Sequence, residues 1–231
     1  MSKRKDIIDG SLAGSKRSGL VYTELLGWID LGHARGDDIR KILANMESGD
    51  KDNHPYYEVV YTQSMGAFSG RFATSKFTKW RVKKGLSLQD RYSIALTMMM
   101  KTAYLFESYQ SRWFFNWYTD SGFSSEDFIS DLLGFYRVVK PMNYFSIIKP
   151  VSKNDALRRW DYYGEIGKYK NRSFNPLIFP DPDKLPNNAR PYYVELPGFM
   201  KAISPMKYFT TDKFEIINGD GTDFKFWFIT I

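Results

Sequence analysis

Three side chains that can carry chemistry lie close together near the start of the chain. Asp30 and His33 are three residues apart, and Arg35 follows shortly after His33. A turn over Gly32–Gly36 would present a carboxylate, an imidazole and a guanidinium together. An imidazole that is held by Asp30 would be a competent general base or acid near neutral pH. His33 is therefore a candidate catalytic residue, with Asp30 and Arg35 as candidate supporting groups.

The second candidate is Glu107, which interrupts the apolar face of a helix predicted over about residues 87–117. Steps of three and four residues from Leu96 lead through positions of one helical face, and two of these positions hold Glu107 and Gln110. A carboxylate in an apolar face must be paired, hydrogen-bonded or protonated, because burying it alone is costly. Glu107 is therefore a candidate catalytic residue, and Tyr109 and Gln110 are candidate supporting groups.

The catalytic hypothesis is that the fold brings His33 close to Glu107. Two titratable groups in differently polar surroundings can divide the roles of acid and base between them. The alternative is a buried hydrogen-bond network of Asp30, His33 and Arg35 with Glu107, which would attach the first segment to the long helix. The sequence leaves both interpretations open.

The composition limits the possible classes of function. The 231 residues are 43% hydrophobic, which is enough for one domain with a substantial core. The net charge of +7 favours anionic partners, or else it reflects a mildly basic surface. No run of five or more Lys and Arg residues occurs, so there is no strong nucleic-acid signal.

Metal and thiol chemistry are limited by the same composition. The absence of cysteine excludes thiol nucleophiles, disulfides and thiolate metal sites, and two histidines are too few for a histidine-rich metal site. Carboxylate binding of a hard cation remains open. The prediction is a site without a metal or a cofactor.

The start of the chain is charged, with Met1–Asp6 reading MSKRKD, and no apolar run of signal-peptide length follows. No apolar stretch is long enough for a membrane helix. These features predict a protein that is cytoplasmic as synthesised. Action at the envelope would then require delivery by a dedicated secretion system.

The predicted fold is one α+β domain over residues 19–231, preceded by a loose basic lead-in over residues 1–18. Its centre is a long buried helix, with further helices packed on a small antiparallel sheet. Strands are predicted at residues 20–23, 56–61, 72–82 and 224–231, and shorter helices at residues 37–46, 128–134 and 157–163. Recurrent prolines after residue 175 preclude long helices there and favour an extended segment.

Two stretches of the chain carry a family resemblance. Residues 19–35, GLVYTELLGWIDLGHAR, contain a YT strand, a Gly-aromatic-Ile-Asp segment and a His-x-Arg turn. Residues 107–110 are similar to a glutamate-centred helix of a known family, and residues 122–134 are similar to its FSPED and SNLLG motifs. In the second stretch, Ser125 stands in place of the proline and Asp131 in place of the asparagine. This pattern resembles the bacterial domain-of-unknown-function family number 4056. The resemblance covers roughly residues 19–140 and implies kinship without an established activity.

These features predict a hydrolase that uses His33 and Glu107 for acid–base chemistry on a bacterial cell-envelope substrate. A secreted antibacterial toxin or effector is the biological role that they suggest. Its partners would be an anionic envelope substrate or an acidic, immunity-like protein. The aromatic residues 113–118 could line a groove for sugar rings or acyl chains, or they could be core. The alternative function is a non-enzymatic binding module for an anionic ligand or an acidic protein partner.

Overall fold

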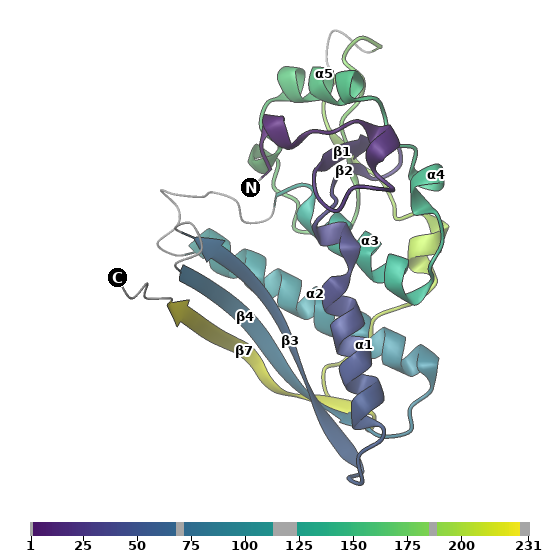
Figure 1. The fold of residues 1–231 in the computed structure, drawn as a ribbon, viewed down its shortest axis with the longest axis vertical. Helices are drawn as coiled ribbons and strands as arrows, with labels where there is room; N and C mark the ends of the chain where they lie inside the picture. Colours follow the sequence, from purple (N-terminus) through teal and green to yellow (C-terminus); the bar gives the residue numbers. More distant parts are fainter. Residues whose placement is uncertain (1, 68–71, 113–123, 185–188, 227–231) are drawn as a thin grey trace. The chain divides into compact units, whose positions relative to one another are not determined.

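The computed structural model describes residues 2–67, 72–112, 124–184 and 189–226. The chain divides into two compact units (Figure 1). Unit 1 comprises Met1–Gly36 and Gln110–Ala202, and unit 2 comprises Asp37–Tyr109 and Ile203–Ile231. This division does not coincide with the boundary at residue 18 that the sequence predicts.

Unit 1 contains a four-stranded sheet in the order β1-β2-β5-β6. Its strands are β1 (Leu20–Thr23), β2 (Gly27–Asp30), β5 (Leu177–Ile178) and β6 (Tyr192–Tyr193). The pairs β1–β2 and β5–β6 are antiparallel, whereas β2 and β5 are parallel. Nearly every residue of β1 and β2 is buried, which agrees with their apolar sequences. The core around them consists of Ile7, Leu20, Tyr22, Trp28, Ala156, Trp160, Ile166, Leu177 and Phe179.

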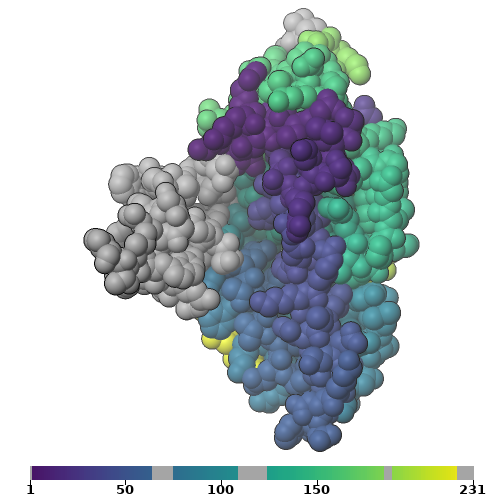
Figure 2. All heavy atoms as spheres, in the orientation of Figure 1, coloured from purple at the N-terminus to yellow at the C-terminus, as the bar shows by residue number. Residues whose placement is uncertain are grey.

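The first residues of the chain belong to this core and do not form the predicted loose lead-in. They contain two short 3-10 helices, η1 (Arg4–Asp6) and η2 (Gly10–Leu12), and lie beside the green segment that includes α5 (Lys153–Tyr163) (Figure 2). Ile7 is fully buried, and the Arg4 guanidinium donates two hydrogen bonds to the Asp161 carboxylate. Buried Ile7 and Ala13, together with the Arg4–Asp161 pair, thus anchor the segment that the sequence predicts to be loose.

The remaining helical elements of unit 1 are η3 (His33–Arg35), α3 (Asp127–Val139), α4 (Tyr144–Ile148), η4 (Ile166–Lys168) and η5 (Gly198–Lys201). Ser152 caps α5, because its hydroxyl oxygen accepts a hydrogen bond from the Asp155 N–H at 3.1 Å. The prediction that the helix after Asp127 stops near Gly134 is wrong. The helix continues for more than a turn, since Gly134 meets another part of the backbone and is not a C-cap.

Unit 2 contains a three-stranded antiparallel sheet in the order β3-β4-β7, with α1 (Asp37–Gly49) and α2 (Leu88–Arg112) (Figure 1). The predicted hairpin is confirmed: β3 (Tyr56–Ala67) pairs with β4 (Phe72–Lys83) along its whole length. Alternate residues of β3 are buried and exposed, as period-two patterning requires. The last strand, β7 (Phe214–Phe226), begins well before the predicted residue 224, and residues 227–231 lie outside the described chain.

The long helix α2 begins where the sequence predicts. The Ser87 hydroxyl oxygen accepts a hydrogen bond from the Asp90 N–H at 3.1 Å and so caps the helix. In its stripe Leu96, Ala103 and Glu107 are at most 4% exposed, as expected, whereas Met100 is half-buried. The described part of the helix ends at Arg112, so residues 113–117 of the predicted helix and the aromatic residues 113–118 lie outside the described chain.

Helices combined with small, mainly antiparallel sheets confirm the predicted α+β class. None of the helices in the described ranges is both long enough and apolar enough to cross a membrane.

Candidate functional site

His33 is presented by the short 3-10 turn η3, which follows directly from strand β2. Asp30, the last residue of β2, holds this turn, because its Oδ1 accepts hydrogen bonds from the N–H groups of Gly32 at 2.6 Å and His33 at 3.4 Å. Gly36 closes the turn in the left-handed conformation, with a φ of 65°. The hydrogen bonds of Asp30 therefore go to the backbone of the turn, whereas the sequence-based hypothesis assumed a bond to the imidazole.

The partner of the imidazole is Asp131, on helix α3. The His33 Nδ1 lies 2.9 Å from the Asp131 Oδ1. The Asp131 side chain is 8% exposed, whereas the His33 side chain is 41% exposed. A buried carboxylate thus fixes the orientation of the ring through Nδ1, which leaves Nε2 as the nitrogen available to a ligand.

Two side-chain hydrogen bonds attach this part of the chain to α3. The Ser130 hydroxyl accepts from the Asp30 N–H at 2.9 Å and donates to the Glu126 carbonyl at 2.5 Å. The Arg137 Nη1 donates to the Ala34 carbonyl at 2.6 Å. One bond precedes His33 and the other follows it, so the turn is attached to α3 on both sides of the histidine.

Close backbone packing makes this attachment possible. Gly134 of α3 lies against η3, where a Cβ atom would come within 2.7 Å of the His33 carbonyl oxygen. A Cβ atom on Gly36 would come within 2.3 Å of the Gly134 carbonyl oxygen. Both positions require glycine for space, and Gly36 requires it also for its positive φ.

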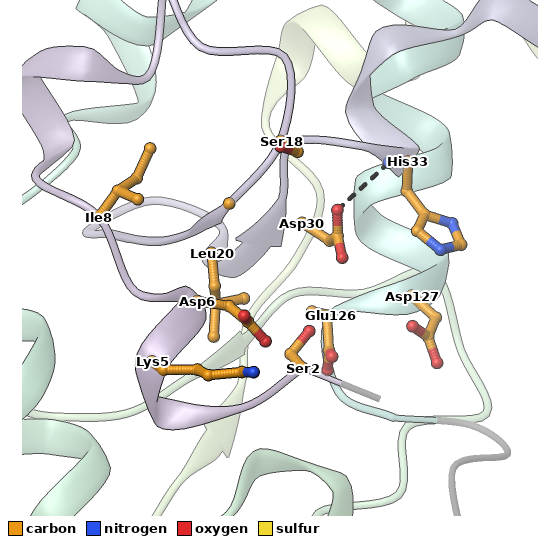
Figure 3. Close-up of a pocket in the computed structure, with 11 residues that line it drawn as sticks. Ser2, Lys5, Asp6, Ile8, Ser18, Leu20, Asp30, His33, Glu126 and Asp127 are labelled. Carbon is orange, nitrogen blue, oxygen red and sulfur yellow. Dashed lines mark hydrogen bonds between the residues drawn. The ribbon is translucent and has the colours of Figure 1, made fainter. Parts of the chain in front are cut away.

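His33 opens onto a pocket of about 440 Å³ in unit 1 (Figure 3). In this view, His33 and Asp127 lie on one side of the pocket, and Lys5 and Ile8 lie on the other. The lining residues are Ser2, Lys5, Asp6, Ile8, Ser18, Gly19, Leu20, Asp30, His33, Glu126 and Asp127. Carboxylates outnumber cationic groups in this lining, so its charge is opposite in sign to the net charge of the chain.

The charge state of His33 follows from its surroundings. Desolvation by the neighbouring protein lowers the pKa of the imidazole, but attraction to Asp131, a hydrogen bond to the same carboxylate, and the charges of Asp127 and Asp30 raise it. The attraction to the carboxylates outweighs the desolvation, so the pKa of His33 lies well above the usual 6.5. His33 is therefore protonated at neutral pH and can act as a proton donor.

This pKa shift predicts how stability depends on pH. The pair of His33 with Asp131 stabilises the fold fully below the unfolded pKa of about 6.5, and this contribution is lost as pH rises through the raised folded pKa. We expect His33→Gln to cost roughly 0.5–1 kcal/mol at about pH 6, since solvent screens the half-exposed ring, and less at about pH 10. Urea unfolding across this range measures the difference.

The matched control is His54→Gln, which removes the exposed second histidine of the chain. We expect this substitution to have little effect on stability at any pH. A cost of His33→Gln that is the same at acid and alkaline pH would contradict the assignment.

The remaining predicted site residues are Glu107, Arg35, Tyr109 and Gln110. Glu107 lies on α2 in unit 2, is 4% exposed and interacts with other groups of the protein, as a carboxylate in an apolar face must. Its pairing with His33, a residue of unit 1, stays a prediction. Arg35 is half-buried and also has an interaction partner. The side chains of Tyr109 and Gln110 lie outside those that the structure describes.

The role of Asp131 was not predicted from the sequence, although one signal was present. Asp127 and Asp131 are four residues apart in a segment predicted to be helical, which places both carboxylates on one helix face. Asp131 is also one of the two departures from the family pattern. What could not be read from the sequence is that this helix face meets His33.

No group of three or more His, Asp or Glu side chains in the described ranges is arranged to hold a metal ion. In comparisons with known proteins, no family model, no curated protein and no solved structure matches the chain, so the function of the site is argued from its geometry.

Proposed function

We propose that this protein is a hydrolase in which His33 is the general acid. The observation that carries the proposal is the 2.9 Å contact between the His33 Nδ1 and the buried Asp131, beside a pocket that His33 itself lines. A histidine that is oriented by a carboxylate and open to a ligand through its other nitrogen is a common acid–base arrangement in enzymes.

In this role, His33 donates its Nε2 proton to the leaving group as the scissile bond breaks. The raised pKa of His33 keeps the proton on the ring at neutral pH, and Asp131 stabilises the imidazolium between turnovers. A correctly placed general acid contributes ~10²–10⁴-fold to the rate. Glu107 is the base in the pairing that the sequence suggests.

The substrate class that we propose is a polymer of the bacterial cell envelope. The net charge of +7 supports approach to an anionic polymer. The excess of carboxylates in the pocket favours a neutral or cationic group of that polymer at the reacting position. A toxic effector delivered to the envelope is the biological role that we propose for this activity.

Expression in a bacterial host tests the proposal. Wild type, His33→Gln and Glu107→Gln are each produced in the cytoplasm and, with an added export signal, in the periplasm, at levels matched by immunoblot. We expect periplasmic wild type to stop growth and His33→Gln to be harmless. His54→Gln serves as the control and should be as toxic as wild type.

Release of dye from covalently dyed bacterial cell-wall sacculi provides the biochemical measurement. Purified wild type should release dye, and His33→Gln should not. Harmless wild type in both compartments would remove the toxin role, and no dye release would remove the cell-wall hydrolase. Both outcomes together would favour the non-enzymatic binding module.

A further inference from the structure

Helix α3 carries two carboxylates beside His33, and their surroundings differ. Asp127 and Asp131 are separated by one helical turn and therefore lie on the same face of α3. Asp131 is 8% exposed and is bonded to the imidazole. Asp127 is half-buried and lines the pocket together with His33 (Figure 3). One carboxylate thus orients the ring, and the other borders the space that a substrate would occupy.

The position of Asp127 favours an ionised carboxylate. Asp127 is the first residue of α3, where the partial positive charge of the helix N-terminus stabilises a negative group. It is also close enough to His33 for its charge to raise the pKa of the imidazole. An ionised carboxylate and a protonated imidazole on the same side of one pocket form a base and an acid ready to act together.

Each of the other carboxylates in the pocket lining takes part in a local hydrogen bond, and Asp127 also has an interaction partner. Asp30 holds the turn η3 through two backbone N–H groups. Glu126 is 1% exposed and accepts a hydrogen bond from the Ser124 hydroxyl. Asp6 accepts from the backbone N–H of the residue that precedes η1. Their removal would disturb local folding before it disturbed chemistry.

We propose that Asp127 is the general base of this site and activates the hydrolytic water while His33 protonates the leaving group. This inference rests on the proposed hydrolase function and assigns to Asp127 the role that the sequence suggests for Glu107. Asp127 takes a proton from water as the water oxygen bonds to the scissile atom. The bond from that atom to the leaving group breaks, and its electron pair takes the proton from the His33 Nε2. Asp127 then releases its proton to solvent, and His33 takes one up.

The pH dependence of dye release from the dyed cell-wall sacculi tests this assignment. For wild type we expect a bell-shaped profile, because the rate falls at acid pH when Asp127 is protonated and at alkaline pH when His33 loses its proton. Asp127→Asn should lower the maximal rate ~10²–10⁴-fold and abolish the acid limb of the profile. Asp127→Ser is a second variant, since serine is well tolerated at a helix start. Circular dichroism confirms that each variant is folded.

Asp161→Asn is the matched control, because it removes one exposed carboxylate of unit 1 that does not line the pocket, and it should keep both limbs. Glu107→Gln is measured in parallel. If Asp127→Asn and Asp127→Ser retain the acid limb, Asp127 is not the base, whereas dye release by wild type still supports the hydrolase. If Glu107→Gln alone loses that limb, the base is Glu107. If wild type releases no dye at any pH, the proposed function and this assignment are both overturned.

Discussion

Replacement of Asp131 by asparagine is expected to slow the proposed hydrolysis by ~10²–10⁴-fold, although Asp131 does not line the pocket. The carboxylate lies 2.9 Å from the His33 Nδ1 and stabilises the protonated ring. A neutral amide of the same size cannot supply this charge, and its N–H₂ group can face Nδ1 and favour the wrong tautomer. The pKa of His33 should fall as a result, so that less of the general acid is protonated at neutral pH.

Two measurements separate this positioning role from loss of the fold. The rate of dye release should fall, and the NMR titration of the His33 ring should shift to lower pH, while the circular dichroism spectrum stays unchanged. Asp161→Asn is the control, since it breaks an exposed ion pair with Arg4 elsewhere in unit 1 and should affect neither quantity. An unchanged rate together with an unchanged titration of His33 would contradict the role of Asp131.

The second large effect is expected from Gly134→Ala. Alanine in a helix interior is ordinarily about 0.5–1 kcal/mol more favourable than glycine. Here the added Cβ atom would come within 2.7 Å of the His33 carbonyl oxygen and within 3.0 Å of the Gly36 nitrogen, and both are backbone atoms. The turn η3 must move away from α3, so we expect a net loss of about 1–3 kcal/mol of stability.

Urea unfolding measures this loss, and dye release should fall with it because the displaced turn carries His33. Gly198→Ala is the matched control, since apart from the adjoining residues no atom lies within 4 Å of a Cβ atom at that position. Its effect should stay within about 0.5 kcal/mol. A more stable Gly134→Ala protein would show that α3 and η3 are not in close contact.

The elements that sequence patterns predicted correctly depend on interactions between residues near one another in the chain. Ser87 caps α2 through a residue three positions away. The hairpin of β3 and β4 follows from an apolar, β-branched run and an alternating run, which a glycine-containing segment separates in the sequence. The buried stripe around Glu107 follows from the period of the helix. Such patterns can be recognised in a single sequence because the interacting residues lie within one helical turn or one hairpin.

The predictions that the structure contradicts concern residues whose contacts are far away in the sequence. Ile7 anchors the supposed lead-in by entering a core built from strands and helices much later in the chain. By its residue type Gly134 suggests a helix stop, whereas in the structure its small size allows close packing against residues 33–36. Composition and local spacing carry no information on which distant backbone approaches a given glycine.

The sequence by itself determined that His33 is one of two histidines, that it follows an aspartate at a turn, and that Glu107 is a buried carboxylate in need of a partner. Only the tertiary structure decided that Asp30 holds the backbone while Asp131 holds the ring. His33 and Asp131 are 98 positions apart. Their contact exists because α3 packs closely against the end of β2 at Ser130 and against η3 at Gly134, and this packing forms only when the whole unit folds.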